Sequence, residues 1–213
     1  AIAQNALTVA DLEQYHDWLK RLFSLELSGA TGEPFINPKF LDIVRHLKTR
    51  YPWLVLTTTT NGSLITEKHI DTLIEIGFDR LLFSVHAVTP ETYRDLQGHD
   101  LAKILTTIRM CAEKKRASGR RSPVLAINFA LNKLNADSIF SLIDEMVGVD
   151  IDFIHVQHYY DTRNVMKQGT KIEDISFYHD IEAGNRHLDR VYVYAREKGV
   201  PLYPKTPMYL KPL

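Results

Sequence analysis

The chain has 213 residues with 26 basic and 26 acidic side chains, so its formal net charge is zero. This length suits one domain with a sizeable apolar core. The balanced charge gives no general attraction to nucleic acid or to acidic membranes. No apolar run approaches the ~18 residues of a membrane span. We therefore expect neither nucleic acid nor a membrane as a partner.

The chain contains one cysteine, Cys111, which excludes an intramolecular disulfide and predicts a reducing, cytoplasmic environment. A single thiol also cannot build a cysteine-ligated metal cluster. Cys111 follows Ile104 by seven residues on the apolar stripe of a predicted helix, and a free cysteine at such a position is typical of the core. We expect no metal ligand within these residues.

Hydrophobic periodicity predicts helices and strands in alternation. In chain order, we expect a helix over 9–20, a strand over 22–28, a helix over 40–50, a strand over 53–58, a helix over 66–77, a strand over 81–85, a helix over 101–119, a strand over 124–130, a helix over 135–147, a strand over 153–157 and a helix over 176–198. Thr8 with Asp11 forms a capping box for the first helix. No stretch has the composition of a linker between domains.

Five strands that alternate with helices predict parallel βαβ units in one α/β domain, as a barrel or as a doubly wound sheet. Ligands of both folds bind at the carboxyl ends of the strands. In this sequence those ends carry small or polar residues rather than further aliphatic ones. Such a rim suits a polar small molecule that lies across several strand ends.

Four blocks in this order carry a family resemblance: "ELSGATGEPFINPKFLDIV", "TTTTNGSLIT", "LLFSVHAVTPETYRDLQG" and "INFALNKLN". Together they resemble the core of the radical S-adenosylmethionine (radical SAM) superfamily, and most closely its SPASM-type branch. The resemblance covers about residues 8 to 207. It implies a partial (β/α)6 barrel of parallel strands, from which the first strand and the cluster loop are missing in this chain.

The resemblance also implies two cofactors at the strand ends, S-adenosylmethionine (SAM) and a 4Fe–4S cluster. In the family, an electron from the cluster splits SAM to a 5′-deoxyadenosyl radical, which removes a hydrogen atom from the substrate. The protein supplies geometry and shielding around this chemistry. The implied partners are a peptide, protein or small-molecule substrate and an electron donor such as flavodoxin or ferredoxin.

The family's glycine-rich turn, which receives the amino group of SAM, corresponds here to Thr31, Gly32 and Glu33. An ammonium group needs several acceptors on a backbone that it can approach closely, which Gly32 allows. The carboxylate of Glu33 adds a charge-assisted hydrogen bond. The alternative for Glu33 is a turn residue paired with a nearby lysine or arginine.

Four further residues match polar positions at strand ends and are implied to bind SAM, namely Asn61, Ser84, His86 and Asn128. Each has an alternative except Ser84, which matches a position that commonly contacts the ribose or the SAM carboxylate. Asn61 suits an ordinary Asn-Gly turn, His86 a structural histidine, and Asn128 a buried amide bonded to the backbone. Asn135 suits the cap of the following helix.

The last strand ends in Gln157, His158 and Tyr160, which face the mouth or the edge of the sheet. Tyr160 and Asp161 are candidates for substrate contact. His155 and His158 lie three residues apart on a strand, so their side chains point to opposite faces and joint ligation of a metal is not expected. The catalytic residues are not identifiable from the sequence.

The family's CxxxCxxC motif is not among these residues. We expect it upstream of Ala1, and we expect residues 199–213 to begin a C-terminal extension. One alternative is a degenerate, cluster-free barrel that binds SAM or a partner. Another is a barrel lyase or aldolase, which usually requires a lysine or metal-binding acids at the strand ends, and these are not present at the five ends.

Overall fold

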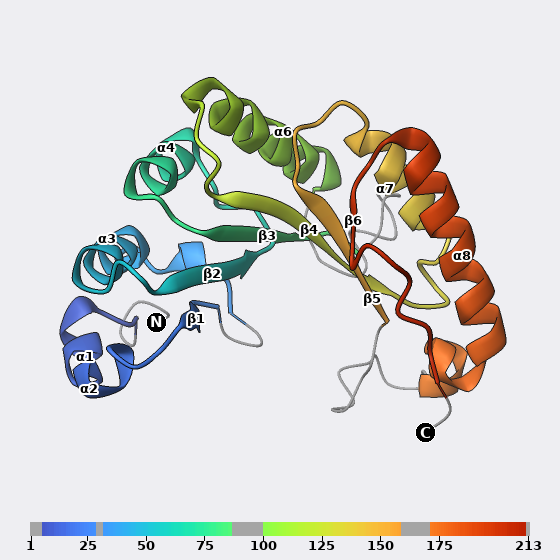
Figure 1. Cartoon of the computed structure of the whole chain (residues 1–213), viewed down its shortest axis with the longest axis horizontal. Coiled ribbons are helices and arrows are strands. Elements are labelled where there is room, and N and C mark those ends of the chain that lie inside the picture. Colours follow the sequence, from blue (N-terminus) through green and yellow to red (C-terminus); the bar gives the residue numbers. More distant parts are fainter. Residues whose placement is uncertain (1–5, 29–31, 87–99, 159–170, 212–213) are drawn as a thin grey trace. The chain divides into compact units, whose positions relative to one another are not determined.

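The computed structural model describes residues 6–28, 32–86, 100–158 and 171–211 (Figure 1). The chain forms two compact units. The first unit comprises residues 1–84 and 103–126, and the second comprises 85–102 and 127–213. The single domain expected from the sequence stays a prediction.

Six strands form one open sheet in the order β1-β2-β3-β4-β5-β6. Their bounds are β1 Ser24–Glu26, β2 Val55–Thr60, β3 Arg80–Ser84, β4 Val124–Leu131, β5 Phe153–His158 and β6 Leu202–Tyr203. The pairs β1–β2, β2–β3 and β5–β6 are parallel, with Glu26 beside Thr57 and Thr57 beside Arg80. This α/β sheet confirms the predicted partial barrel of parallel strands. The short strand β6 was not expected.

In the first unit, three long helices follow the predicted pattern: α3 Phe40–Arg50, α4 Glu67–Ile76 and α6 Leu101–Ser118. They lie along one side of strands β1 to β3 (Figure 1). Thr66 caps α4 through a bond from the backbone N–H of His69, and Gly77 ends this helix in the left-handed conformation. Cys111 is fully buried on α6, which confirms its predicted place in the core.

The predicted helix over 9–20 is instead two short helices, α1 Val9–Glu13 and α2 His16–Leu19. The capping box of Thr8 and Asp11 is present. Beyond it, Nδ1 of His16 lies 2.7 Å from the hydroxyl of Tyr51. This tertiary bond lies next to the break between α1 and α2. Local periodicity could not predict that His16 bonds to Tyr51.

Strand β2 shows how the sheet of the first unit presents its two faces. Leu56, Thr58 and Thr60 are buried, while the alternating residues Val55, Thr57 and Thr59 are partly exposed. Since successive side chains of a strand point to opposite faces, the buried row faces the helices and the other row faces away from them. The open row therefore leaves polar side chains accessible along this face.

In the second unit, α7 Ser138–Met146 packs beside α8 Ile181–Lys198 (Figure 1). Helix α7 begins three residues later than expected. The predicted helix over 176–198 is divided into the 3-10 turn η4 Phe177–His179 and α8, because the side chain of Asp180 caps α8 at the backbone N–H of Ala183. A further turn, η3, spans Ile172–Asp174. No helix among the described residues has the length and apolarity to cross a membrane.

Candidate functional site

The carboxylate of Glu33 holds the chain at the start of the 3-10 turn η2 Pro34–Ile36. One carboxylate oxygen accepts the hydroxyl of Thr60 at 2.7 Å and the backbone N–H of Phe35 at 3.3 Å. The other accepts the backbone N–H of Asn61 at 2.8 Å. Glu33 thus ties the turn to the end of β2, a structural role that the sequence did not indicate. A carboxylate offers about four acceptor positions, so one further donor can still bind.

Gly32 stands beside Glu33 and has no structural need to be a glycine. A Cβ at this residue would meet no atom of the described chain within 4 Å, and its backbone is not left-handed. Gly62 behaves differently, because its φ is +76° and a Cβ there would lie 3.1 Å from the ring of Phe83. The free space at Gly32 is therefore available to a ligand. Thr31 lies outside the described residues.

The segment after β2 is a tight hydrogen-bonded turn. The hydroxyl of Thr60 accepts the backbone N–H of Gly62 at 2.9 Å, and Oδ1 of Asn61 accepts that of Ser63 at 2.8 Å. The oxygen of the Asn61 side chain thus makes the Asn-Gly turn that was the alternative from sequence. Binding of SAM by Asn61 stays a prediction.

The open face of the first unit carries a polar group that sequence reasoning missed. Glu26 is exposed on β1 and accepts hydrogen bonds from the hydroxyls of Ser28 and Thr59. The hydroxyl of Ser28 in turn accepts the backbone N–H of Thr59 at 3.1 Å. Ser84, at the end of β3, is partly exposed. Period-two alternation of "ELS" after an apolar run was the signal that could have found Glu26.

In the second unit, His86 is a neutral acceptor. Its Nδ1 accepts the backbone N–H of Ala130 at 3.1 Å, and burial lowers its pKa to about 4. The proton of the neutral ring is therefore assigned to Nε2. This bond connects the end of β3 to the end of β4, which is the structural role left open from sequence. Contact with SAM stays a prediction.

Asn135 does not cap a helix, which corrects the alternative considered from sequence. The N-cap position of α7 belongs to Asp137. The amide nitrogen of Asn135 instead donates to the carbonyl oxygens of His86 at 2.7 Å and Ala130 at 2.8 Å, and its Oδ1 accepts the backbone N–H of Asn132. Asn135 is 1% exposed and fixes the backbone on which His86 stands.

Asn128 on β4 has an unmet acceptor. Its backbone carbonyl accepts the N–H of Val85 at 3.2 Å, but its side-chain Oδ1 is buried and has no hydrogen-bond partner within the described part of the chain. Buried polar atoms are paired in the great majority of cases, so an exception requires an explanation. The alternative of an amide bonded to the backbone does not account for this oxygen. A hydrogen-bond donor from a ligand or from an ordered water would satisfy it.

The end of β5 holds two histidines. His155 packs against Tyr203, while His158 packs against Phe177 and Tyr178. In the part of the chain that the structure describes, no three histidine, cysteine or acidic side chains lie close enough together to hold a metal ion. Tyr160 and Asp161 lie outside the described residues.

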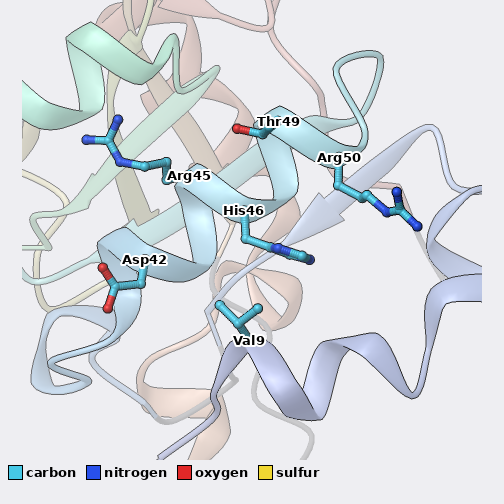
Figure 2. Close-up of a pocket in the computed structure, with 6 residues that line it drawn as sticks. All are labelled: Val9, Asp42, Arg45, His46, Thr49 and Arg50. Atoms are coloured by element: carbon cyan, nitrogen blue, oxygen red, sulfur yellow. The ribbon is translucent and has the colours of Figure 1, made fainter.

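A cavity of about 590 Å³ between α1 and α3 contains none of the predicted site residues. Figure 2 shows that Arg45 and Arg50 extend to opposite sides of α3, while His46 lies on the side of α3 that faces Val9. His46 lies 3.0 Å from a carboxylate oxygen of Glu13. The basic side chains that line the cavity do not converge on a common point, so the cavity is not assigned a function.

The residues present fit SAM but not an iron–sulfur cluster. In the first unit, the space at Gly32 suits the close approach of a ligand group such as an ammonium. In the second unit, the unmet oxygen of Asn128 suits a hydrogen-bond donor. The thiol of Cys111 is buried, and burial raises its pKa to about 12, so it is not available as a thiolate ligand. The one cysteine of the sequence is therefore not a cluster ligand.

A parallel sheet with polar strand ends is typical of α/β proteins that bind small molecules at this edge of the sheet. The profile of the Radical SAM superfamily matches residues 2–146. The chain belongs to this superfamily.

Two curated relatives are similar in sequence. The chain is 30% identical over 145 residues to a probable GTP 3′,8-cyclase of Thermococcus kodakarensis. The aligned region covers 67% of this chain and 44% of the relative. It is 27% identical over 131 residues to a tungsten-containing aldehyde ferredoxin oxidoreductase cofactor-modifying protein of Pyrococcus furiosus. This aligned region covers 61% of the chain and 36% of that relative. The chain thus spans less than half the length of these relatives.

Solved structures share the fold. SuiB of Streptococcus suis, bound to the precursor peptide SuiA, superposes with a TM-score of 0.71 at 20% identity, covering 93% of this chain and 42% of that one. A domain of a pyruvate-formate lyase-activating enzyme from Bacteroides vulgatus gives a TM-score of 0.61 at 15% identity, covering 84% and 96%.

Proposed function

We propose that this chain is the SAM-binding core of a radical SAM enzyme. The observation that carries the proposal is the unmet buried oxygen of Asn128, at a residue that the family resemblance matches to SAM. Membership of the superfamily supports the same cofactor. When bound beside a reduced cluster, SAM supplies a carbon radical that abstracts hydrogen from a substrate.

The chain's own residues would bind and orient SAM. Gly32 leaves room for the ammonium group, and Glu33 can offer its remaining acceptor position. The side chains of Asn61, Ser84 and Asn128 would contact other polar atoms of SAM. His86, neutral at pH 7, would serve as a hydrogen-bonding group rather than as a charge.

The binding of SAM can be tested without any turnover, by titration calorimetry of the protein with SAM. Asn128→Leu removes the unmet oxygen at similar volume, so we expect SAM affinity to fall about tenfold or more, a loss of about 1.4 kcal/mol. The free energy of unfolding should stay the same or rise, because no protein hydrogen bond of this oxygen is lost. Unchanged affinity in this variant would contradict the proposal.

Gly32→Ala provides a second test in the first unit. The added Cβ meets nothing in the described chain, so we expect no change in the free energy of unfolding. A ligand that approaches the backbone closely would meet this methyl group, so SAM affinity should fall about tenfold or more. Thr49→Ala, on the exposed face of α3, is the control and should change neither quantity.

The finer assignment is a SPASM-type enzyme that acts on a peptide, with a cluster held by cysteines outside these residues and reduced by flavodoxin or ferredoxin. The likeness to SuiB in complex with its precursor peptide supports a peptide substrate. The full gene product, prepared without oxygen, should form 5′-deoxyadenosine when a reductant is added. SAM binding without 5′-deoxyadenosine, unaffected by air, would favour the cluster-free binding module instead.

A further inference from the structure

The second unit contains a cavity of about 500 Å³ at the carboxyl end of β5. Its wall combines the end of β5 with Tyr178 of η4, Leu188 of α8 and the terminal segment 208–211. None of the residues matched to SAM lines it. The cavity is therefore a candidate for a different ligand.

His158 forms part of this wall and has unmet hydrogen bonds. Both ring nitrogens are buried, and neither has a hydrogen-bond partner among the residues that the structure describes. The neighbouring His187 bonds to the carbonyl oxygen of Ala136 at 2.9 Å, so it does not serve as a partner. Burial, and to a smaller extent His187, lowers the pKa of His158 to about 4, so the ring is neutral at pH 7. A neutral ring has one donor and one acceptor to satisfy.

The terminal segment that closes the cavity is firmly attached. The backbone N–H of Leu210 donates to Oδ1 of Asn185 at 2.8 Å, and the amide of Asn185 donates to the Leu210 carbonyl at 3.1 Å. Gly184 allows this close approach, since a Cβ there would lie 3.1 Å from Leu210 and 2.8 Å from Phe177. The wall is thus a built part of the fold.

The chemistry of the lining indicates the ligand. Lys211 contributes a positive charge, and no acidic residue belongs to the described lining. Gln157 and His158 add neutral hydrogen-bonding groups. The rest of the lining is largely apolar or aromatic and includes Leu188 and Met208. A ligand with a carboxylate and an apolar body matches both parts of this wall.

We propose that this cavity binds an apolar carboxylate, whose charged end contacts Lys211 and a reoriented His158 and whose body packs on Leu188 and Met208. A rotation of the His158 side chain brings a ring nitrogen from its buried position to the ligand. The carboxylate belongs either to a free organic acid or to the C-terminus of a peptide. This site is additional to the proposed SAM site and does not depend on it.

The test uses N-acetyl-leucine, its amide, and an acetylated tripeptide that ends in leucine, each titrated into the full protein by calorimetry. We expect N-acetyl-leucine to bind and its amide to bind about tenfold more weakly or not at all. Tripeptide binding at similar or higher affinity assigns the site to a peptide terminus. Binding of N-acetyl-leucine alone assigns it to a free acid.

Variants separate the ligand role from a packing role. His158→Phe should abolish binding of the acid, while the melting temperature stays the same or rises because two unmet polar atoms are removed. Lys211→Ala should weaken binding about threefold to tenfold, and Lys205→Ala, which lies outside the lining, should leave it unchanged. Should the phenylalanine variant fail to fold, Lys211→Ala and Gln157→Leu decide the question.

Two results would overturn the proposal: equal affinity for the acid and the amide, including no binding of either, or wild-type affinity in folded His158→Phe or in Lys211→Ala. SAM titrations of the same samples are a separate readout. Loss of acid binding with intact SAM binding concerns only this cavity, so failure of one proposal is distinguishable from failure of the other.

Discussion

The end of β2 in the first unit and the strands β4 and β5 in the second unit use their polar residues differently. Around Glu33, the carboxylate, the Thr60 hydroxyl and the Asn61 backbone satisfy one another. In the second unit, Asn128 and His158 keep buried atoms that no described residue pairs. Polar residues on or beside the strands of one sheet can therefore either bond to one another or keep an unpaired atom that a ligand could bind.

The largest effect on stability is expected for Glu33→Ala. This change leaves three donors without an acceptor, and we expect the free energy of unfolding to fall by about 2–4 kcal/mol. Glu33→Gln keeps one acceptor oxygen, so its free energy of unfolding should fall by about half as much. Glu75→Ala, at an exposed carboxylate on α4, should change stability by less than about 0.5 kcal/mol. Urea denaturation measures all three, and a loss in Glu33→Ala as small as in the control would show that the turn does not depend on the carboxylate.

A second, smaller effect concerns His86 and the pH. Its pKa is about 4 in the folded protein because of burial, against about 6.5 in an unfolded chain. Between these values the unfolded state binds more protons, so stability is complete above about pH 6.5 and falls as the pH is lowered. We expect a loss of roughly 2 kcal/mol between pH 6.5 and 5 from this residue.

His86→Gln isolates this contribution. The glutamine oxygen can accept the N–H of Ala130 and does not titrate, so the pH dependence of the unfolding free energy should become less steep over this range. Part of the slope remains, because the pKa of His158 is lowered in the same direction. An identical slope in the variant would show that His86 does not remain neutral on folding.

The alternation of helices and strands was predictable because most long elements have a regular apolar period, as in α4 and β3. Strand β6 was missed because its two residues lie between prolines and carry no period. The break at Tyr15 lies beside the bond from His16 to Tyr51, which is 35 residues away in the chain. Asn135 bonds to His86, which is 49 residues away. Local patterns contain no information on such pairs.

The candidate site was only partly predictable for the same reason. Residue types in the four blocks identified where SAM binds in the family. The saturation of Glu33 and the unmet atoms of Asn128 and His158 depend on which groups fold next to them. Residue type therefore predicts the chemistry of a side chain. Which of its hydrogen-bonding atoms lack a partner depends on the packed structure.

Two threonines of the same strand differ in the same way. Thr58 and Thr60 both lie on the buried face of β2, at 0% and 2% exposure. The hydroxyl of Thr60 bonds to Glu33 and Gly62, whereas that of Thr58 has no partner among the described residues. Thr60→Val should therefore destabilise the protein by about 1–3 kcal/mol, because it leaves a buried N–H unpaired.

Thr58→Val keeps the β-branched shape and removes an unmet hydroxyl, so it should stabilise the protein by up to about 1 kcal/mol. Urea denaturation of the two variants side by side gives the sign directly. Because strand, face, burial and substitution are the same, opposite signs can come only from hydrogen bonding. A destabilised Thr58→Val would show that this hydroxyl has a partner, such as an ordered water, and that an unmet atom in this fold need not indicate a ligand.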